Sequence, residues 1–409
     1  MKITVSTLGC DAGKSGIGRY IVTLLEHWVH GGLNLAIYGH DSERASLISG
    51  DGARYWKSVS EIWHRPVPSV LWHQAVLPRA SCSSDVLFLP AANRRLPVYH
   101  SVPSVGTVHD CSSLHVENKY DAAREFYIRQ VLPWLMQKLD HVITVSESTK
   151  TDLVDYCGIP ASRITVIPLA ADHLIFFPRD KAECRVVLSR KHKISQPFLL
   201  YVSRIEHPGK NHVGLIHAFE ILKQTYAVPH DLVFVGPERE RSEQVHEVAR
   251  RSPCSGSIRF IGPVPGDDLP VFYNAAEVFV LPSLYEGFGL PILEAMASKT
   301  PVSCSDRSSL PEVAGGCATT FNPYDEADVA EAILRLLQED SVARLERVER
   351  GFARSAQFTW NSTSDRTLEV LQRVASGGSS SARDARALRN IQRESVVLHE
   401  GDVVGAGKG

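Results

Sequence analysis

The fold of this chain is decided by the stretch Val278-Phe279-Val280-Leu281-Pro282-Ser283-Leu284-Tyr285-Glu286-Gly287-Phe288-Gly289-Leu290-Pro291-Ile292-Leu293-Glu294. Its first four residues are apolar, and a segment rich in glycine follows, so the pattern predicts a strand that ends in a turn. A helix is expected to begin near Leu290, because Pro291 then lies in the first helical turn, where a missing amide hydrogen costs least. The stretch therefore predicts a strand–turn–helix unit.

Two glutamates, Glu286 and Glu294, flank this turn. The turn is expected to present backbone N–H groups and the positive end of a helix dipole beside the two carboxylates. Such a site suits a ligand that is anionic at one end and rich in hydroxyl groups at the other, and a nucleotide sugar is a ligand of this kind. The alternative is that both glutamates are surface residues at the start of a helix.

Similar strand-like runs recur along the whole chain. Its 409 residues predict two or three domains at about 100–200 residues each. Apolar runs alternate with helical segments at residues 3–8, 34–38, 86–89, 105–107, 142–145, 198–202, 232–235, 258–261 and 278–281. Continuous apolar runs are typical of parallel strands covered on both faces, and their alternation with helices predicts a doubly wound α/β fold.

The strand pattern is interrupted at residues 172–196, which predicts a division into two halves of similar size. We expect one Rossmann-like domain at residues 1–178 and a second at residues 179–355. A helix at residues 356–375, capped by Thr359, is expected to follow. Residues 376–409 lack an apolar face that could pack, so they are expected to form a disordered tail.

Composition excludes several classes of protein. A hydrophobic content of 44% and a charged content of 22% are ordinary for a globular protein, and a net charge of −2 gives no basic field for nucleic acid. Eight scattered cysteines favour reduced thiols over a disulfide framework or a zinc site. No apolar run of about 20 residues and no signal peptide is seen, which predicts a cytoplasmic protein, with peripheral association to the inner face of a membrane left open.

At Glu286-x7-Glu294, with Gly-Phe-Gly-Leu-Pro between, the chain resembles the donor-site signature of family 4 glycosyltransferases, retaining enzymes of GT-B architecture. The resemblance covers roughly residues 1–375 and is strongest over residues 195–330. It implies two Rossmann-like domains with parallel sheets facing across a cleft, and a last helix, at residues 356–375, that crosses back to the first domain. It also implies transfer of a sugar from a nucleotide-diphosphate sugar to a saccharide or lipid-linked saccharide, with retention of anomeric configuration.

The sequence indicates the class of reaction more clearly than the identity of the donor. The sequence around Arg204 looks most like bacterial surface-polysaccharide enzymes, among which mannosyl donors are frequent, so GDP-mannose is favoured. A UDP- or dTDP-sugar is the alternative. No Asp-x-Asp motif occurs in the chain, so neither a metal nor another cofactor is expected.

Two cations follow the strand-like run at residues 198–202. A departing diphosphate needs positive charge in a water-poor cleft, and Arg204 and Lys210 could supply it. In the resembled family an Arg and a Lys at matching positions hold the diphosphate. Five residues separate them here rather than the family's usual four, and Pro208-Gly209 could absorb the extra residue. Basic residues that are merely solvated are the alternative.

The resemblance assigns roles to the residues of the turn. Glu286 would bind hydroxyls of the donor sugar, and Glu294 would bind the ribose hydroxyls. The turn from Gly287 to Leu290, and above all the amides of Phe288 and Gly289, would meet the diphosphate.

The first half carries two further motifs. Gly16 and Gly18 lie in a glycine-rich loop, which the resemblance places beside the donor phosphate and the acceptor. His109 follows a strand and would face the donor sugar, although a base is not expected in a front-side retaining transfer. In the second half, backbone near Val264 would contact the nucleotide base. Ordinary turns and a structural histidine are the alternatives.

Two functions of other classes stay open at this point. The run from Gly9 to Ser15 looks like a P-loop of an ATPase or kinase, but three residues separate its glycines where the motif needs four. A catalytically silent protein that binds nucleotide sugars is the second.

The acceptor is expected in the first half, where Trp63, Trp72, Arg94 and Arg95 could meet a lipid-linked saccharide or merely pack a long loop. Packing is favoured. The whole interpretation requires both glutamates to lie in a cleft between the domains, with the two cations within about 10 Å of the turn, roughly a screening length.

Overall fold

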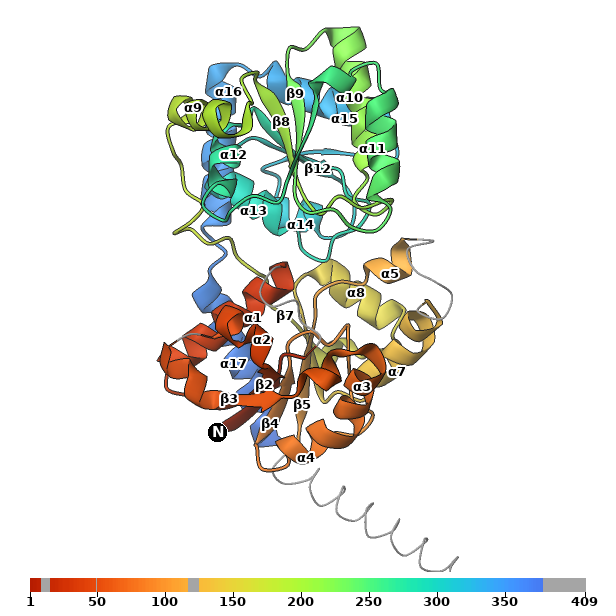
Figure 1. Cartoon of the computed structure of the whole chain (residues 1–409), viewed down its shortest axis with the longest axis vertical. Coiled ribbons are helices and arrows are strands. Elements are labelled where there is room, and N and C mark those ends of the chain that lie inside the picture. The colour runs from red at the N-terminus through yellow and green to blue at the C-terminus, as the bar shows by residue number, and fades with distance from the viewer. Residues whose placement is uncertain (9–14, 49, 117–124, 378–409) are drawn as a thin grey trace, which may run out of the picture.

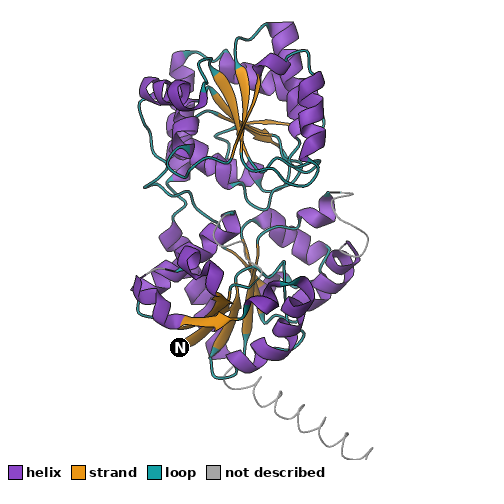
Figure 2. Ribbon diagram, viewed as in Figure 1, coloured by secondary structure: helices purple, strands orange, loops and turns teal. Residues whose placement is uncertain are grey.

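The computed structural model describes residues 1–8, 15–48, 50–116 and 125–377. Figure 1 shows two lobes stacked along the long axis, with the red-to-yellow part of the chain in one lobe and the green-to-blue part in the other. Helices cover both faces of the strands in each lobe, which is the layered arrangement expected for buried parallel sheets (Figure 2).

Within the described residues, the first sheet has seven strands, all paired in parallel, in the order β3-β2-β1-β4-β5-β6-β7. Their bounds are β1 (Lys2–Ser6), β2 (Asn34–His40), β3 (Trp56–Val59), β4 (Val86–Leu89), β5 (Ser104–Val108), β6 (His141–Thr144) and β7 (Ile164–Val166). The order reverses between β1 and β4, and ligands of open α/β sheets bind at such switch points.

The second sheet has six described strands, also parallel, in the order β10-β9-β8-β11-β12-β13. They are β8 (Phe198–Val202), β9 (Asp231–Val235), β10 (Ile258–Gly262), β11 (Val278–Leu281), β12 (Val302–Ser305) and β13 (Thr319–Phe321). The predicted fold class, two doubly wound parallel α/β units, is confirmed. The apolar runs quoted above did not include β3, β7, β12 and β13, which are short or carry several polar residues.

Helices lie between these strands along the chain, and α15, α16 and α17 follow the last of them. They are α1 (Gly16–His30), α2 (Asp41–Leu47), α3 (Pro66–Leu71), α4 (Leu77–Ser81), α5 (Ser112–His115), α7 (Leu132–Met136), α8 (Glu147–Asp155), α9 (Lys181–His192), α10 (His212–Tyr226), α11 (Ser242–Arg251), α12 (Leu269–Ala275), α13 (Leu290–Ala297), α14 (Leu310–Ala314), α15 (Glu326–Leu337), α16 (Ser341–Ser355) and α17 (Trp360–Gly377). Shorter 3-10 or π segments are η1 (Gly50–Tyr55), η2 (Glu61–His64), η3 (Trp72–Val76), η4 (Tyr127–Val131), η5 (Ala161–Arg163) and η6 (Ser255–Ser257).

Helix α17 returns to the first lobe, where its blue ribbon lies beside the strands of the first sheet (Figure 1). Thr359 caps it, since its Oγ1 accepts a hydrogen bond of 3.2 Å from the amide of Ser362. Thr363 Oγ1 donates to the carbonyl of Pro168 at 2.7 Å and so attaches the helix to the chain just after β7. The domain limits at residues 178 and 355 stay a prediction, and residues 378–409 of the expected tail lie outside the described residues.

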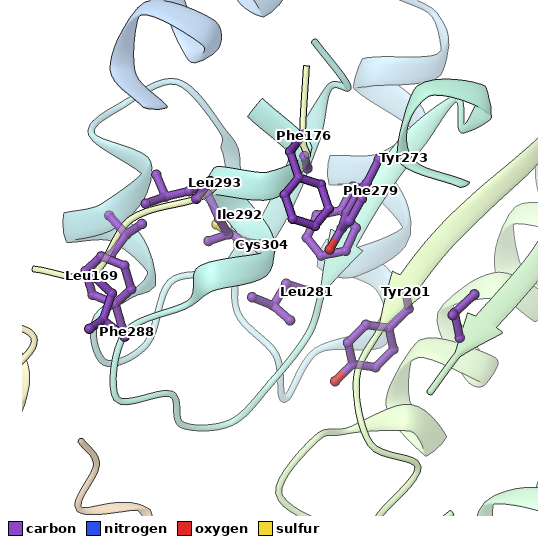
Figure 3. Close-up of a cluster of buried hydrophobic side chains, with 14 of the residues drawn as sticks. Leu169, Phe176, Tyr201, Tyr273, Phe279, Leu281, Phe288, Ile292, Leu293 and Cys304 are labelled. Carbon is purple, nitrogen blue, oxygen red and sulfur yellow. The ribbon is translucent and has the colours of Figure 1, made fainter. Parts of the chain in front are cut away.

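An aromatic cluster in the second lobe supports the helix that carries Glu294. Figure 3 shows Phe176, Tyr273 and Phe279 packed together near Ile292 and Leu293 of α13. The rings of Phe176 and Tyr273 meet edge to face at 5.7 Å, and those of Tyr273 and Phe279 lie 5.4 Å apart. Aromatic packing of this kind holds a side chain in one place, so the buried hydroxyl of Tyr273 has a defined position.

Candidate active site

A cleft of about 1310 Å³ lies between the two halves of the chain. It is lined at the carboxyl ends of strands from both sheets, where parallel α/β folds bind their ligands. The lining residues include Gly16, Arg19, Trp63, Asn93, Arg94, Arg95 and His109 from the first half, and Arg204, Lys210, Glu286, Gly287, Phe288, Gly289, Leu290 and Glu294 from the second. Both predicted glutamates and both predicted cations therefore line one cleft.

Glu286 is fixed by hydrogen bonds to its side chain and its backbone. Its Oε1 accepts from Lys210 Nζ at 2.6 Å and from Ser283 Oγ at 2.7 Å. Its amide donates to Ser308 Oγ at 2.9 Å, and its carbonyl oxygen accepts from Ser309 Oγ at 2.8 Å. No described residue donates a hydrogen bond to Oε2, so that oxygen can accept one from a ligand.

The loop that carries Lys210 is attached to the turn. The buried Tyr201 hydroxyl donates to the Lys210 carbonyl at 2.7 Å, and burial raises the pKa of Tyr201 well above its usual value, so it stays protonated. The carbonyl of Gly209 accepts from the amide of Leu284 at 3.0 Å. The extra residue in this loop therefore leaves Lys210 in contact with Glu286.

Arg204 is placed less tightly than Lys210. Half of its side chain is exposed to solvent, and its Nη2 lies 3.3 Å from Glu206 Oε2. A guanidinium has five N–H donors, so this pair leaves several of them available in the cleft.

The two halves make a close backbone contact at Gly287. A Cβ on this residue would lie 1.8 Å from the carbonyl oxygen of His109, a separation that no side chain can adopt. The Gly287 carbonyl accepts from Ser146 Oγ at 2.7 Å, and this serine also caps α8. The turn of the second half is therefore held against the ends of β5 and β6 in the first.

The same turn leads into α13, which begins at Leu290 as predicted. Gly289, in its N-cap position, has a φ of 105°, a left-handed conformation that favours glycine. Among the described residues, nothing accepts a hydrogen bond from the amides of Phe288 and Gly289. These amides and the helix dipole give the turn the chemistry of an anion-binding site.

Glu294 is buried and is held at both carboxylate oxygens. Arg19 Nη1 donates to Oε1 at 2.8 Å, and the Tyr273 hydroxyl donates to Oε2 at 2.8 Å. Arg19 was not among the predicted site residues. Its only signal in the sequence is its place next to Gly18, on the first turn of the helix after the glycine-rich loop.

His109 lies at the cleft in its neutral form. Burial lowers the pKa of its imidazole to about 4, and Nε2 lies 2.8 Å from the carbonyl oxygen of Pro90. Because a carbonyl only accepts, the ring donates from Nε2, which leaves Nδ1 as an acceptor.

The remaining predicted residues fall into two groups. Gly16 lines the cleft, and a Cβ on it would lie 3.2 Å from Leu290 Cδ1. Gly18 is buried, and its amide donates to Oγ of Ser15, the cap of α1, at 3.3 Å. Val264 is partly buried against the core of the second half. Neither of these two residues is among those that line the cleft, and their predicted roles stay predictions.

On the acceptor side, packing was favoured for four residues of the first half. Trp63, Arg94 and Arg95 line the cleft, and Trp63 also packs, partly buried, against the apolar core of the first half. For these three residues the choice between acceptor binding and packing stays a prediction. Trp72 is a packing residue, buried against Tyr38 with ring centroids 6.1 Å apart.

A second set of contacts between the halves lies beside the turn. The Tyr285 hydroxyl donates to Asp152 Oδ2, and the ring of His115 stacks on Tyr285 at 4.6 Å. The carboxylate of Glu312 accepts from the amide of Glu147 at 3.0 Å, at the first turn of α8. No sequence motif points to these residues, because each contact joins segments far apart in the chain.

Comparison with known proteins places the chain in a family. Residues 14–173 match the model of the family described as Glycosyltransferase Family 4, and residues 187–351 match Glycosyl transferases group 1. The O-antigen chain mannosyltransferase B of Escherichia coli is 34% identical over 267 residues, which cover 65% of this chain and 69% of that relative. The chain belongs to glycosyltransferase family 4. This membership leaves the P-loop alternative, which falls largely on residues outside the described part, without support.

Other relatives extend the comparison. The serotype-specific mannosyltransferase WbdA of Escherichia coli is 31% identical over 255 residues. This match covers 61% of the present chain and 31% of WbdA. The solved structure of WaaG, a glycosyltransferase involved in lipopolysaccharide biosynthesis, has a TM-score of 0.68 at 14% identity and covers 91% of this chain and 99% of its own. The structure of Anabaena HepE with UDP-glucose has a TM-score of 0.71 at 16% identity, over 91% of this chain and 100% of its own. These structures show the GT-B fold.

We predict that Gly287→Ala lowers the catalytic efficiency of this glycosyltransferase roughly 10-fold to 100-fold, the effect of about 1–3 kcal/mol of overpacking. The added methyl would force the turn away from His109 and displace Phe288 and Gly289. Steady-state kinetics measures the effect. Gly266→Ala is the control, because nothing lies within 4 Å of a Cβ at that exposed position. Equal kinetics in the two variants would contradict the prediction.

The lowered pKa of His109 predicts a pH dependence of stability. The folded state holds the imidazole neutral down to a pKa of about 4, whereas an unfolded chain protonates it near 6.5. The unfolded state therefore binds more protons between these values, so this contribution is complete above pH 6.5 and is lost as the pH falls toward 4. Thermal unfolding of His109→Gln should depend less on pH between 7.5 and 5 than that of the wild type, while exposed His30→Gln should behave as wild type.

Proposed function

We propose that the protein transfers a mannosyl residue from GDP-mannose to a saccharide or lipid-linked saccharide, with retention of configuration, in the synthesis of a surface polysaccharide. The observation that carries the proposal is the pair of glutamates on either side of the glycine turn, with Lys210 bonded to Glu286, in a cleft between two Rossmann-like halves. The names of the mannosyltransferase relatives support the sugar and the pathway class. A UDP- or dTDP-sugar is the alternative donor.

The diphosphate of the donor would lie at the glycine turn. The amides of Phe288 and Gly289 point to an anion at this place, and Lys210 and Arg204 line the same cleft. As the bond to the sugar breaks, negative charge develops on the leaving phosphate oxygen, and donors that are already in place stabilise it best.

The sugar would lie between Glu286 and His109. Glu286 Oε2 and His109 Nδ1 are acceptors, so each could take a hydrogen bond from a sugar hydroxyl. A base with a pKa of about 4 removes a proton from an acceptor hydroxyl poorly, so His109 is suited to binding and not to proton abstraction. In the front-side transfer that we propose, the acceptor oxygen bonds to the anomeric carbon while the leaving phosphate oxygen takes its proton.

The acceptor would lie against the first half. Asn93 Oδ1 is buried there without a hydrogen-bond partner among the described residues, and Trp63, Arg94 and Arg95 line the same wall. Polar and aromatic side chains in this combination suit a saccharide, since hydroxyls bond to the polar groups and sugar rings pack on indole.

A donor titration tests the proposal. Binding of GDP-mannose, UDP-glucose, dTDP-rhamnose and ATP is measured by calorimetry, and the product configuration is read by proton NMR. We expect GDP-mannose to bind most tightly and the new linkage to retain the donor's configuration. Binding of ATP alone, or inversion at the anomeric carbon, would overturn it. Glu286→Gln should still bind donor but lose at least about 10²-fold in turnover if Glu286 acts in the transition state; a silent binding protein would change in affinity only.

We further propose peripheral membrane association through the rim of the acceptor wall. None of the helices in the described part of the chain is long and apolar enough to cross a bilayer. However, Ile62, Val67 and Leu71 are 62%, 70% and 56% exposed, on η2 and α3 beside the cleft residue Trp63. Exposed apolar side chains at the edge of a site that takes a lipid-linked acceptor suit a lipid surface.

Vesicle flotation tests this association. Val67→Ser with Leu71→Ser should weaken binding to anionic vesicles roughly 10-fold, because two apolar side chains are lost from the contact. The matched control is Val342→Ser with Leu345→Ser on α16, which changes side chains of similar exposure in the other half. An equal loss in both pairs, or binding in neither the wild type nor the variants, would contradict the assignment.

A further inference from the structure

Two helices that belong to different sheets meet at Glu294. On α1, Gly16 and Arg19 are three residues apart, and on α13, Leu290 and Glu294 are four residues apart, so each pair lies on one face of its helix. Gly16 faces Leu290, and Arg19 bonds to Glu294. The first turn of α1 is therefore packed along the first turns of α13.

The carboxylate of Glu294 is held there by two donors that differ in kind. The Tyr273 hydroxyl is fully buried in the aromatic cluster of the second half, so it is a fixed neutral donor to Oε2. Arg19 brings a full positive charge from the first half to Oε1, and its side chain is 37% exposed whereas that of Glu294 is 7% exposed. Arg19 is thus the only described cation bonded to this carboxylate.

We infer that Arg19 is a positioning residue for the donor nucleotide: it holds Glu294 in the orientation in which the carboxylate accepts the two ribose hydroxyls. The inference rests on the proposed function. A carboxylate has about four lone-pair sites, and Arg19 and Tyr273 use one on each oxygen. One site remains on each oxygen, which matches the two hydroxyls of a ribose.

Arg19 is needed because Glu294 is almost out of contact with water. Without the guanidinium, a buried carboxylate would be left with a single neutral donor, and a charge in that position is costly. It would then turn toward solvent or take up a proton, and in either case its ribose contacts would be lost. Since Arg19 comes from the other half, the ribose site is complete only when the two halves adjoin.

Deoxynucleotides test this inference. The ligands are the nucleoside diphosphate of the donor that binds the wild type, and its 2′-deoxy and 3′-deoxy forms, titrated by calorimetry. We expect Arg19→Ala to weaken binding of the ribonucleotide roughly 10-fold to 100-fold, as for loss of a hydrogen bond to a charged group. Binding of each deoxy form should weaken by a smaller factor, because each keeps only one of the two hydroxyls, so the variant should lose most of its discrimination between ribose and deoxyribose. Arg19→Lys should restore part of that discrimination.

The control is Arg239→Ala, another exposed arginine of the cleft, which should weaken the ribo and deoxy forms by equal factors. A second check is Arg19→Ala in a Glu294→Ala background, where no further loss is expected. An equal effect of Arg19→Ala on the ribo and deoxy nucleotides would show a phosphate contact or a structural role and would overturn the inference. If the alanine variant unfolds at a lower temperature than the wild type, Arg19→Gln replaces it in the same titrations. Failure of the wild type to bind any nucleoside diphosphate would instead overturn the proposed function.

Discussion

The site depends on one close approach, the contact of Gly287 with the carbonyl of His109. No residue with a Cβ could stand at position 287 while the two backbones are this close. The contact brings the turn of the second half to the strand ends of the first, where Ser146 bonds to the Gly287 carbonyl. With the turn in this position, the residues that carry the free amides, Phe288 and Gly289, and the two glutamates line the cleft. The architecture of the cleft therefore follows from a local requirement for glycine.

Placing two carboxylates in such a cleft has an electrostatic cost, and the structure offsets it with partners that are present before any ligand binds. Glu286 has Lys210 and Ser283, and Glu294 has Arg19 and Tyr273. A buried carboxylate without such partners would be destabilised by several kcal/mol or would be protonated. Because the partners already fix both side chains, little reorganisation is needed when the donor binds, which is the condition under which electrostatic stabilisation of a transition state is strongest.

Local features of this fold were readable from the sequence, and contacts between the halves were not. Strands β8 and β11 and the start of α13 lie where apolar runs and Pro291 predict them, and Thr359 caps its helix as predicted, because strand propensity and capping depend on near neighbours. The apolar pattern did not predict strands β12 and β13, because their serines and threonines interrupt it. The Arg19–Glu294 pair joins residues 275 positions apart, and only the docking of two sheets brings them together.

Several contacts between the halves are polar and individually small, and this has a consequence for turnover. Tyr285 with Asp152, Glu312 with the start of α8, and Arg19 with Glu294 are hydrogen bonds and ion pairs that water can replace when the halves separate. Contacts of this kind permit relative motion of domains more readily than a large apolar interface does. A transferase must release a charged nucleotide after each cycle, and a cleft closed by exchangeable polar contacts can open to do so. The partners of each glutamate within its own half, Lys210 for Glu286 and Tyr273 for Glu294, would then keep the proposed donor site partly formed while the cleft is open.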